Sequence, residues 1–100
     1  MIMRIWTGRT PASKADAYLK LMRTLALPDY RGVDGCRGAW ATRRIEGDVA
    51  TFRMVSVWDN LDAIEVFAGV PADDARYYDF DDDFLLEKEP KVLHVECWDH

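Results

Sequence analysis

Cysteine and histidine are both scarce in this sequence, which holds two residues of each kind. Cys36 and Cys97 match neither the ligand spacing of a metal site nor that of a redox motif. We therefore predict that no metal is bound and that both thiols stay reduced, as is usual in the cytoplasm.

Positive charge and long apolar runs are lacking as well. The chain has 13 basic and 18 acidic residues, a net charge of −5 and a pI near 4.9. Because phosphates bind to basic surfaces, this balance argues against nucleic acid and against anionic membranes as partners. No stretch approaches the roughly 20 apolar residues of a membrane span, and the short apolar start soon meets Gly8 and Arg9, so we expect no signal peptide. The composition predicts a soluble, cytoplasmic protein.

Motifs for phosphate, nucleophile or calcium chemistry are missing too. There is no glycine-rich phosphate loop and no nucleophile motif. The acidic run at residues 79–83 lacks the loop glycine and the distal glutamate of a calcium-binding loop. We interpret this run as a solvated acidic turn that caps a helix.

The strongest positive signal is a strand that leads directly into a helix, over residues 57–67. Residues 51–58 are rich in β-branched and aromatic side chains, whereas apolar residues recur at helical spacing afterwards. Asp59 or Asn60 is the expected N-cap, because a short side-chain oxygen accepts from free N–H groups of the first turn. Gly69 suits the other end of the helix.

Hydrophobic periodicity predicts one domain over residues 1–100, with four strands and two helices. The strands are expected at residues 2–7, 37–45, 49–58 and 91–98, and the helices at 11–27 and 60–68. Thr10 can cap the first helix, with Ser13 as a competing start. Pro28 should end the first helix, because proline disfavours helical geometry in the residue before it. Residues 71–89 carry weaker signals, with helical turns expected at 73–78 and near 84–87.

The order β-α-β-β-α-β predicts an α+β, ferredoxin-like antiparallel sheet with strand order 4-1-3-2 and both helices on one face. Alternation along the strands leaves neither face polar. Since an apolar face must be covered, we expect a second copy of the sheet to cover it in a homodimer.

One face of this sheet is expected to carry the large and polar side chains. Matching neighbouring strands by side-chain size places on it Trp6, Trp40, Trp58 and Trp98 with Arg4, Met54, His94 and Glu96. We favour this face as a pocket lining, and the alternative is that it forms the dimer core. The first and fourth strands are neighbours, so Arg4 should lie opposite His94 or Glu96, either as a structural pair or as functional groups.

Five stretches carry a family resemblance over nearly the whole chain. They are Met3-Arg4-Ile5-Trp6, Val57-Trp58-Asp59-Asn60-Leu61-Asp62-Ala63-Ile64, Ala75-Arg76-Tyr77-Tyr78, Asp81-Asp82-Asp83-Phe84-Leu85-Leu86-Glu87 and Pro90-Lys91-Val92-Leu93-His94-Val95-Glu96. Together they resemble the antibiotic biosynthesis monooxygenase superfamily, whose members are dimeric α/β barrel proteins. The resemblance implies a homodimer with a pocket between sheet and helices in each subunit.

That family includes cofactor-free monooxygenases that oxidise aromatic polyketides, which implies a small aromatic substrate here. Such chemistry needs a deprotonated substrate in a dry pocket. The candidate catalytic residues are His94, Arg4, Tyr77 and Tyr78, and the candidate substrate-binding residues are Trp6, Met54, Trp58 and Phe67. The alternative is a non-catalytic ligand-binding or structural homodimer.

Haem-degrading members of the same family carry an iron-binding histidine late in or just after the second helix and an asparagine on the first strand. The comparable positions here hold Tyr77 or Tyr78 and Trp6. We therefore expect neither haem nor any other cofactor.

Overall fold

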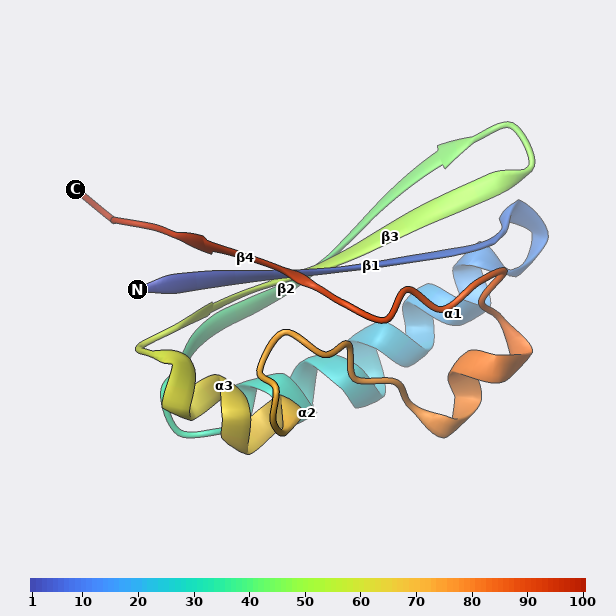
Figure 1. Cartoon of the computed structure of the whole chain (residues 1–100). Helices are drawn as coiled ribbons and strands as arrows, with labels where there is room; N and C mark the ends of the chain where they lie inside the picture. The colour runs from blue at the N-terminus through green and yellow to red at the C-terminus, as the bar shows by residue number, and fades with distance from the viewer.

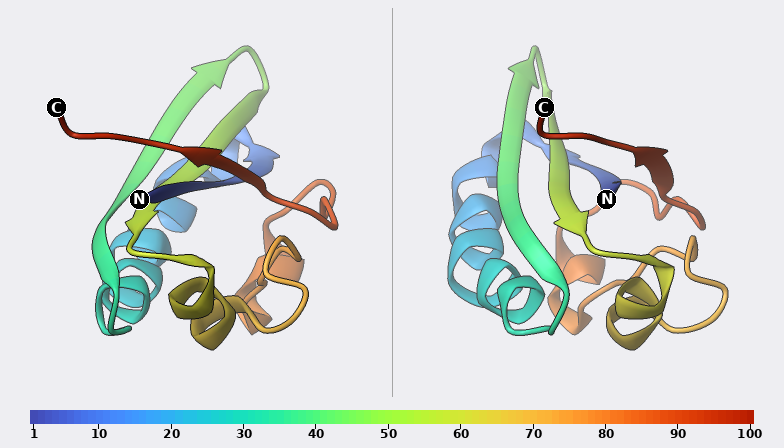
Figure 2. Two further views of the ribbon diagram at one scale, coloured as in Figure 1. Left: turned by 60° about the vertical axis from the view of Figure 1, so that its left-hand side comes forward. Right: turned by 90° about the vertical axis from the view of Figure 1, so that its left-hand side faces the viewer.

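The computed structural model describes residues 1–100 and confirms the predicted α+β architecture (Figure 1). A four-stranded antiparallel sheet contains β1 (Ile2–Pro11), β2 (Cys36–Glu46), β3 (Val49–Trp58) and β4 (Leu93–Glu96). Its order is β2-β3-β1-β4, which reads 4-1-3-2 from the other edge. The helices all lie on one side of the sheet in both views of Figure 2.

Two strands differ in length from the sequence prediction. β1 continues past its expected end at residue 7, because β3 offers it a partner along its whole length, from Trp58 opposite Ile2 to Val49 opposite Pro11. Proline is tolerated there because it stands at the end of the strand. β4 is shorter than the predicted 91–98 and pairs only with residues 2–5 of β1.

The first helical segment extends beyond Pro28, which corrects the predicted end. It consists of a 3-10 turn η1 (Ala12–Lys14), α1 (Ala15–Leu21), a π-helical turn η2 (Met22–Ala26) and α2 (Leu27–Arg31). The N–H of Leu27 donates to the carbonyl of Met22, five residues back. Pro28 is the second residue of α2, directly after this turn, where its ring would otherwise crowd the carbonyl four residues before it. The π-helical turn thus carries the chain past the proline.

The second helix, α3 (Leu61–Ala68), follows β3 as predicted. Asn60 is its N-cap, because its side-chain oxygen accepts from the N–H of Ala63 at 3.0 Å. Asp59 instead forms an ion pair with Arg37. Gly69 ends the helix with φ of 86°, a conformation that glycine adopts without strain.

Residues 69–92 contain only one helical element, the 3-10 turn η3 (Asp79–Asp83), and the turns expected at 73–78 and 84–87 are absent. The acidic run is not wholly solvated either. Asp81 is 1% exposed and accepts from the hydroxyl of Tyr18 and the N–H of Tyr78, each at 2.7 Å. This carboxylate therefore fastens η3 to α1.

The core lies between the sheet and the helices, and the strand register decides which side chains enter it. The two-residue turn between β2 and β3 pairs Glu46 with Val49, which sets Ala39 and Ala41 toward the helices and Trp40 away from them. Trp40 is 51% exposed, and Trp98 lies beyond β4 with 74% exposed. The prediction that all four tryptophans share a face was wrong, because side-chain size does not set register.

The other sheet face is covered by no helix of this chain (Figure 2), and it is apolar at one end, around residues 3–5 of β1 and 55–57 of β3, whereas Thr7, Thr42 and Arg53 lie at its other end. Val55, at its centre, pairs with Ile5 on one side and with Trp40 on the other. We call this surface the open sheet face; its apolar residues are Met3, Ile5, Trp40, Val55, Val57, Leu93 and Val95.

Candidate functional site

Arg4 brings a buried positive charge into the layer between sheet and helices. Its side chain points from β1 toward the helices and is 1% exposed. Nη1 donates to the carbonyl of Ala72 at 2.6 Å, and Nη2 donates to that of Asp74 at 2.9 Å. Neither partner is a carboxylate, and burial lowers the pKa of Arg4. Since a guanidinium stays protonated in proteins, the site holds a cation that donates to backbone carbonyls rather than to a carboxylate.

His94 lies opposite Arg4 on β4, as one of the two predicted pairings has it. Its Nε2 is 3.1 Å from Nη1 of Arg4. Because a guanidinium only donates, Nε2 must accept, and we assign the ring proton to Nδ1. Burial and the charge of Arg4 both lower the pKa of His94, so the imidazole is neutral at pH 7. It borders an open groove between α3 and residues 70–73.

The lowered pKa of His94 predicts that acid weakens the fold near neutrality. Its imidazole binds protons more weakly in the folded chain than at its ordinary pKa of 6.5. Unfolded chains therefore take up more protons, and stability falls as the pH drops below 6.5. Urea unfolding should show a smaller loss over that range in His94→Gln than in the wild type. His100→Gln, at an exposed residue, is the control, and parallel profiles for wild type and His94→Gln would contradict the assignment.

Aromatic rings form one wall of the site. Phe67 packs against Trp58 with ring centroids 5.5 Å apart and against Tyr30 at 4.3 Å. Two guanidinium groups contact the same Phe67 ring: Arg76 at 4.6 Å from its centroid and Arg4 at 5.8 Å. The rings of this wall are therefore apolar, and two positive charges lie over the ring of Phe67.

The tyrosine pair closes the site from the opposite side. The hydroxyl of Tyr78 donates to Oδ2 of Asp29 at 2.7 Å, and Nη1 of Arg76 donates to the same oxygen. The hydroxyl of Tyr77 donates to the backbone carbonyl of Glu89. Burial raises the pKa of Tyr77 to about 12 and that of Tyr78 further. Both phenols are therefore protonated at neutral pH and serve as donors rather than bases.

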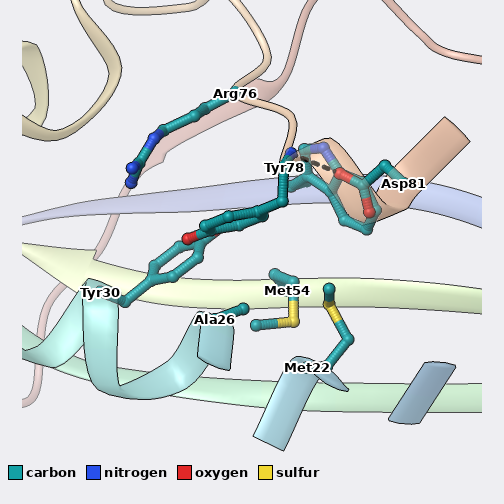
Figure 3. Close-up of a pocket in the computed structure, with 8 residues that line it drawn as sticks. Met22, Ala26, Tyr30, Met54, Arg76, Tyr78 and Asp81 are labelled. Atoms are coloured by element: carbon teal, nitrogen blue, oxygen red, sulfur yellow. Dashed lines mark hydrogen bonds between the residues drawn. The ribbon is translucent and has the colours of Figure 1, made fainter. Parts of the chain in front are cut away.

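A small cavity lies beside Tyr30 and Tyr78 (Figure 3). Its volume is about 10 Å³, which is room for roughly one water molecule. Arg76 extends above the rings of Tyr78 and Tyr30 in Figure 3, and Met22 and Met54 lie on the other side of these rings. The cavity is lined by Trp6, Met22, Ala26, Tyr30, Met54, Arg76, Tyr78 and Asp81.

Most of the predicted site residues converge on this layer. Arg4, Trp6, Met54 and Trp58 are buried on the helix-facing side of the sheet, and Phe67 of α3 packs against Trp58. Tyr77 packs edge-on against Trp6 with centroids 6.0 Å apart. His94 reaches the site only through Arg4.

Sequence reasoning missed Asp29, Tyr30, Arg76 and Asp81. Asp29 and Tyr30 were overlooked because Pro28 was expected to end the helix, although both belong to α2. Arg76 directly precedes Tyr77 and Tyr78 in the sequence, and this position is the one signal that could have indicated its place in the site. Nothing in the acidic run distinguishes Asp81 from its neighbours, because its burial depends on Tyr18, far away in the sequence.

Comparison with known proteins supports the fold and nothing more specific. No family model and no curated protein matches the chain. Among solved structures, that of Rv0793 from Mycobacterium tuberculosis is similar, with a TM-score of 0.60 and 16% identity over 100% of this chain and 98% of that one. No helix here is both long and apolar enough to cross a membrane. At that identity, the likeness to Rv0793 shows that the two chains share a fold.

Proposed function

We propose that this protein is a homodimeric, cofactor-independent monooxygenase acting on a small aromatic compound held between sheet and helices. One observation carries the proposal. The guanidinium of Arg4 is buried without a carboxylate partner, next to a neutral imidazole and an aromatic wall. Such a site is suited to stabilise the phenolate or enolate of an aromatic substrate, since a fixed cation in a dry site favours a developing anion.

The proposed reaction converts a ring C–H carbon, conjugated with a phenol or enol oxygen, into a carbonyl. The deprotonated substrate passes one electron to dioxygen, and the resulting radicals combine to form a carbon–oxygen bond. The peroxide then loses its outer oxygen as water, which takes up the hydrogen of that carbon and the proton first removed from the substrate hydroxyl. One atom of dioxygen thus enters the product, and the substrate supplies all the electrons.

His94 is the proposed base and Arg4 the proposed anion-binding group. In the unliganded site Nε2 of His94 accepts from Nη1 of Arg4. When Nη1 turns to the substrate oxygen, Nε2 becomes free to take the substrate proton. The anion then lies next to two cations, which offsets the repulsion between them. Trp6, Met54, Trp58 and Phe67 would line the ring-binding space.

The proposed assembly pairs two ferredoxin-like sheets through their open sheet faces into a dimeric α/β barrel. Supporting this arrangement, Trp40 is 51% exposed, Leu93 57% and Val95 39% on that face. Apolar side chains gathered on one surface favour association, because burying them removes apolar area from water.

Oxygen uptake tests the catalytic proposal. With a panel of anthrones and quinols, we expect the wild type to consume oxygen and His94→Gln to lose about 10²- to 10⁴-fold in rate, the usual effect of removing a positioned base. Arg9→Gln is the control, because Arg9 lies on β1, as Arg4 does, but pairs with Glu87 and Glu89 away from the site. Wild-type inactivity across the panel, or full activity in His94→Gln, would overturn the assignment.

A second function, ligand binding without catalysis, is favoured by the tight closure of the site. The cavity of about 10 Å³ admits no aromatic ring while Tyr78 occupies its place. A binding protein needs only slow opening, whereas a catalyst must open in every turnover. Saturable ligand binding without oxygen uptake would select this alternative.

A further inference from the structure

The buried hydrogen-bonding groups around the site show an excess of donors. Only two buried side-chain polar atoms lack a partner, Nε of Arg4 and Nε1 of Trp6, and both are N–H donors. Arg4 is 1% exposed and Trp6 is 4% exposed, and both project from the same face of β1. A buried donor without an acceptor destabilises the site, because it has lost its hydrogen bond to water. A ligand that fits this site must therefore bring acceptor oxygens.

The charge around these donors has the sign that suits an anion. Arg4 and Arg76 contact the same Phe67 ring, so two guanidinium groups lie within a few ångströms of it. Asp29 forms its ion pair with Arg76 and accepts a hydrogen bond from the hydroxyl of Tyr78. Asp81 is occupied by Tyr18 and by the Tyr78 backbone. Asp73 lies near Arg4, but it pairs with Lys91 at 3.3 Å and is half exposed. No carboxylate hydrogen-bonds to Arg4, so its charge is open to a ligand.

The size of the ligand follows from what closes the cavity. Tyr78 belongs to a segment without helix or strand, and its hydroxyl is held by one hydrogen bond to Asp29. If the Tyr78 ring swings outward, it vacates the volume of one phenol ring beside Trp6, Tyr30 and Met54, which line the same cavity. A single substituted benzene ring matches that volume.

We propose that this site selects one-ring aromatic ligands that carry an anionic oxygen, which accepts hydrogen bonds from the free N–H groups of Arg4 and Trp6. The inference names the substrate class of the proposed function and rests on that function for the location of the site. Carboxylates and phenolates share the required chemistry. Neutral aromatics of the same shape would leave the charge of Arg4 unbalanced.

Calorimetric titration with benzoate, 4-nitrophenolate and the neutral isostere benzamide tests this selectivity. We expect the wild type to bind benzoate roughly 10- to 100-fold more tightly than benzamide, the range for a charge-assisted hydrogen bond. The ratio of the 4-nitrophenolate and benzoate dissociation constants tells which anion the site prefers. Trp6→Phe keeps an aromatic ring but removes the N–H, and it should reduce the preference for benzoate over benzamide about 10-fold.

Arg4→Gln should abolish the preference for benzoate over benzamide. If Arg4→Gln fails to fold, Trp6→Phe still tests the inference. Arg9→Gln removes an equal charge from the same strand outside the site and should leave the preference unchanged. A purely structural role of Trp6 would weaken benzoate and benzamide equally. Equal affinity of the wild type for benzoate and benzamide, or no saturable binding of either anion, would overturn the inference. Anion-selective binding without oxygen uptake would support this ligand class and refute the proposed catalysis. Turnover of neutral quinols without anion preference would support catalysis and refute this ligand class.

Discussion

Val55→Lys should convert the proposed dimer into a monomer of 11.5 kDa. Val55 lies at the centre of the open sheet face, paired with Ile5 and with Trp40. In a two-fold dimer each substitution appears twice, so two like charges would be buried in one interface. Burying an unpaired charge costs several kcal/mol, and about 4 kcal/mol corresponds to a thousandfold weaker dimer.

Sedimentation velocity at several concentrations measures the change. Val66→Lys is the matched control: it introduces the same substitution on α3, where Val66 is 79% exposed on the helical side. Circular dichroism should show that Val55→Lys stays folded, since Val55 is only half-buried in the single chain. A monomeric wild type, or a Val55→Lys protein that dimerises as strongly as the wild type, would refute the proposed assembly.

Trp58→Ala should lower the free energy of unfolding by about 3–5 kcal/mol, the usual cost of removing a large core aromatic. Trp58 is fully buried and packs on Phe67 at 5.5 Å. Its Nε1–H also donates to Oγ of Ser56 at 2.8 Å, and that hydroxyl is itself buried. The truncation therefore leaves both a cavity and an unpaired polar atom. Since small domains are stable by only about 5–15 kcal/mol, this loss is a large fraction of the total.

Urea unfolding with two companions separates these contributions. Trp58→Phe keeps a ring but leaves Ser56 unpaired, and should cost about 1–3 kcal/mol. Trp98→Ala, at a residue that is 74% exposed, should change stability by no more than about 0.5 kcal/mol. If Trp58→Ala were as mild as Trp98→Ala, the core placement of Trp58 would be wrong.

Local signals in the sequence predicted several elements closely. The third strand and the helix after it were expected at residues 49–58 and 60–68, and they occur at Val49–Trp58 and Leu61–Ala68. Asn60 was one of two expected caps, and Gly69 the expected end. Each of these features depends on residues within a few positions of one another, so periodicity and capping chemistry are sufficient to find them.

Predictions failed where distant partners decided the outcome. The end of β1 was placed too early because its continued pairing with β3 is invisible from residues 8–11 alone. Pro28 did not end the helix, since the π-helical turn and the packing of α2 against β2 override its local preference. Trp40 was assigned to the wrong face because the turn before Val49, rather than side-chain size, sets the register.

The strand that leads into α3 and the order of the elements could be predicted from the sequence, because neighbouring residues and the handedness of crossovers determine them. The strand order also placed Arg4 beside the fourth strand, with His94 or Glu96 as its partner. Only the tertiary structure decided which sheet face meets the helices, that Asp29 and Arg76 hold Tyr78 over the cavity, and that Asp81 is buried against Tyr18. These contacts join residues far apart in the chain. Their energies depend on burial and on the exact register, which no local pattern records.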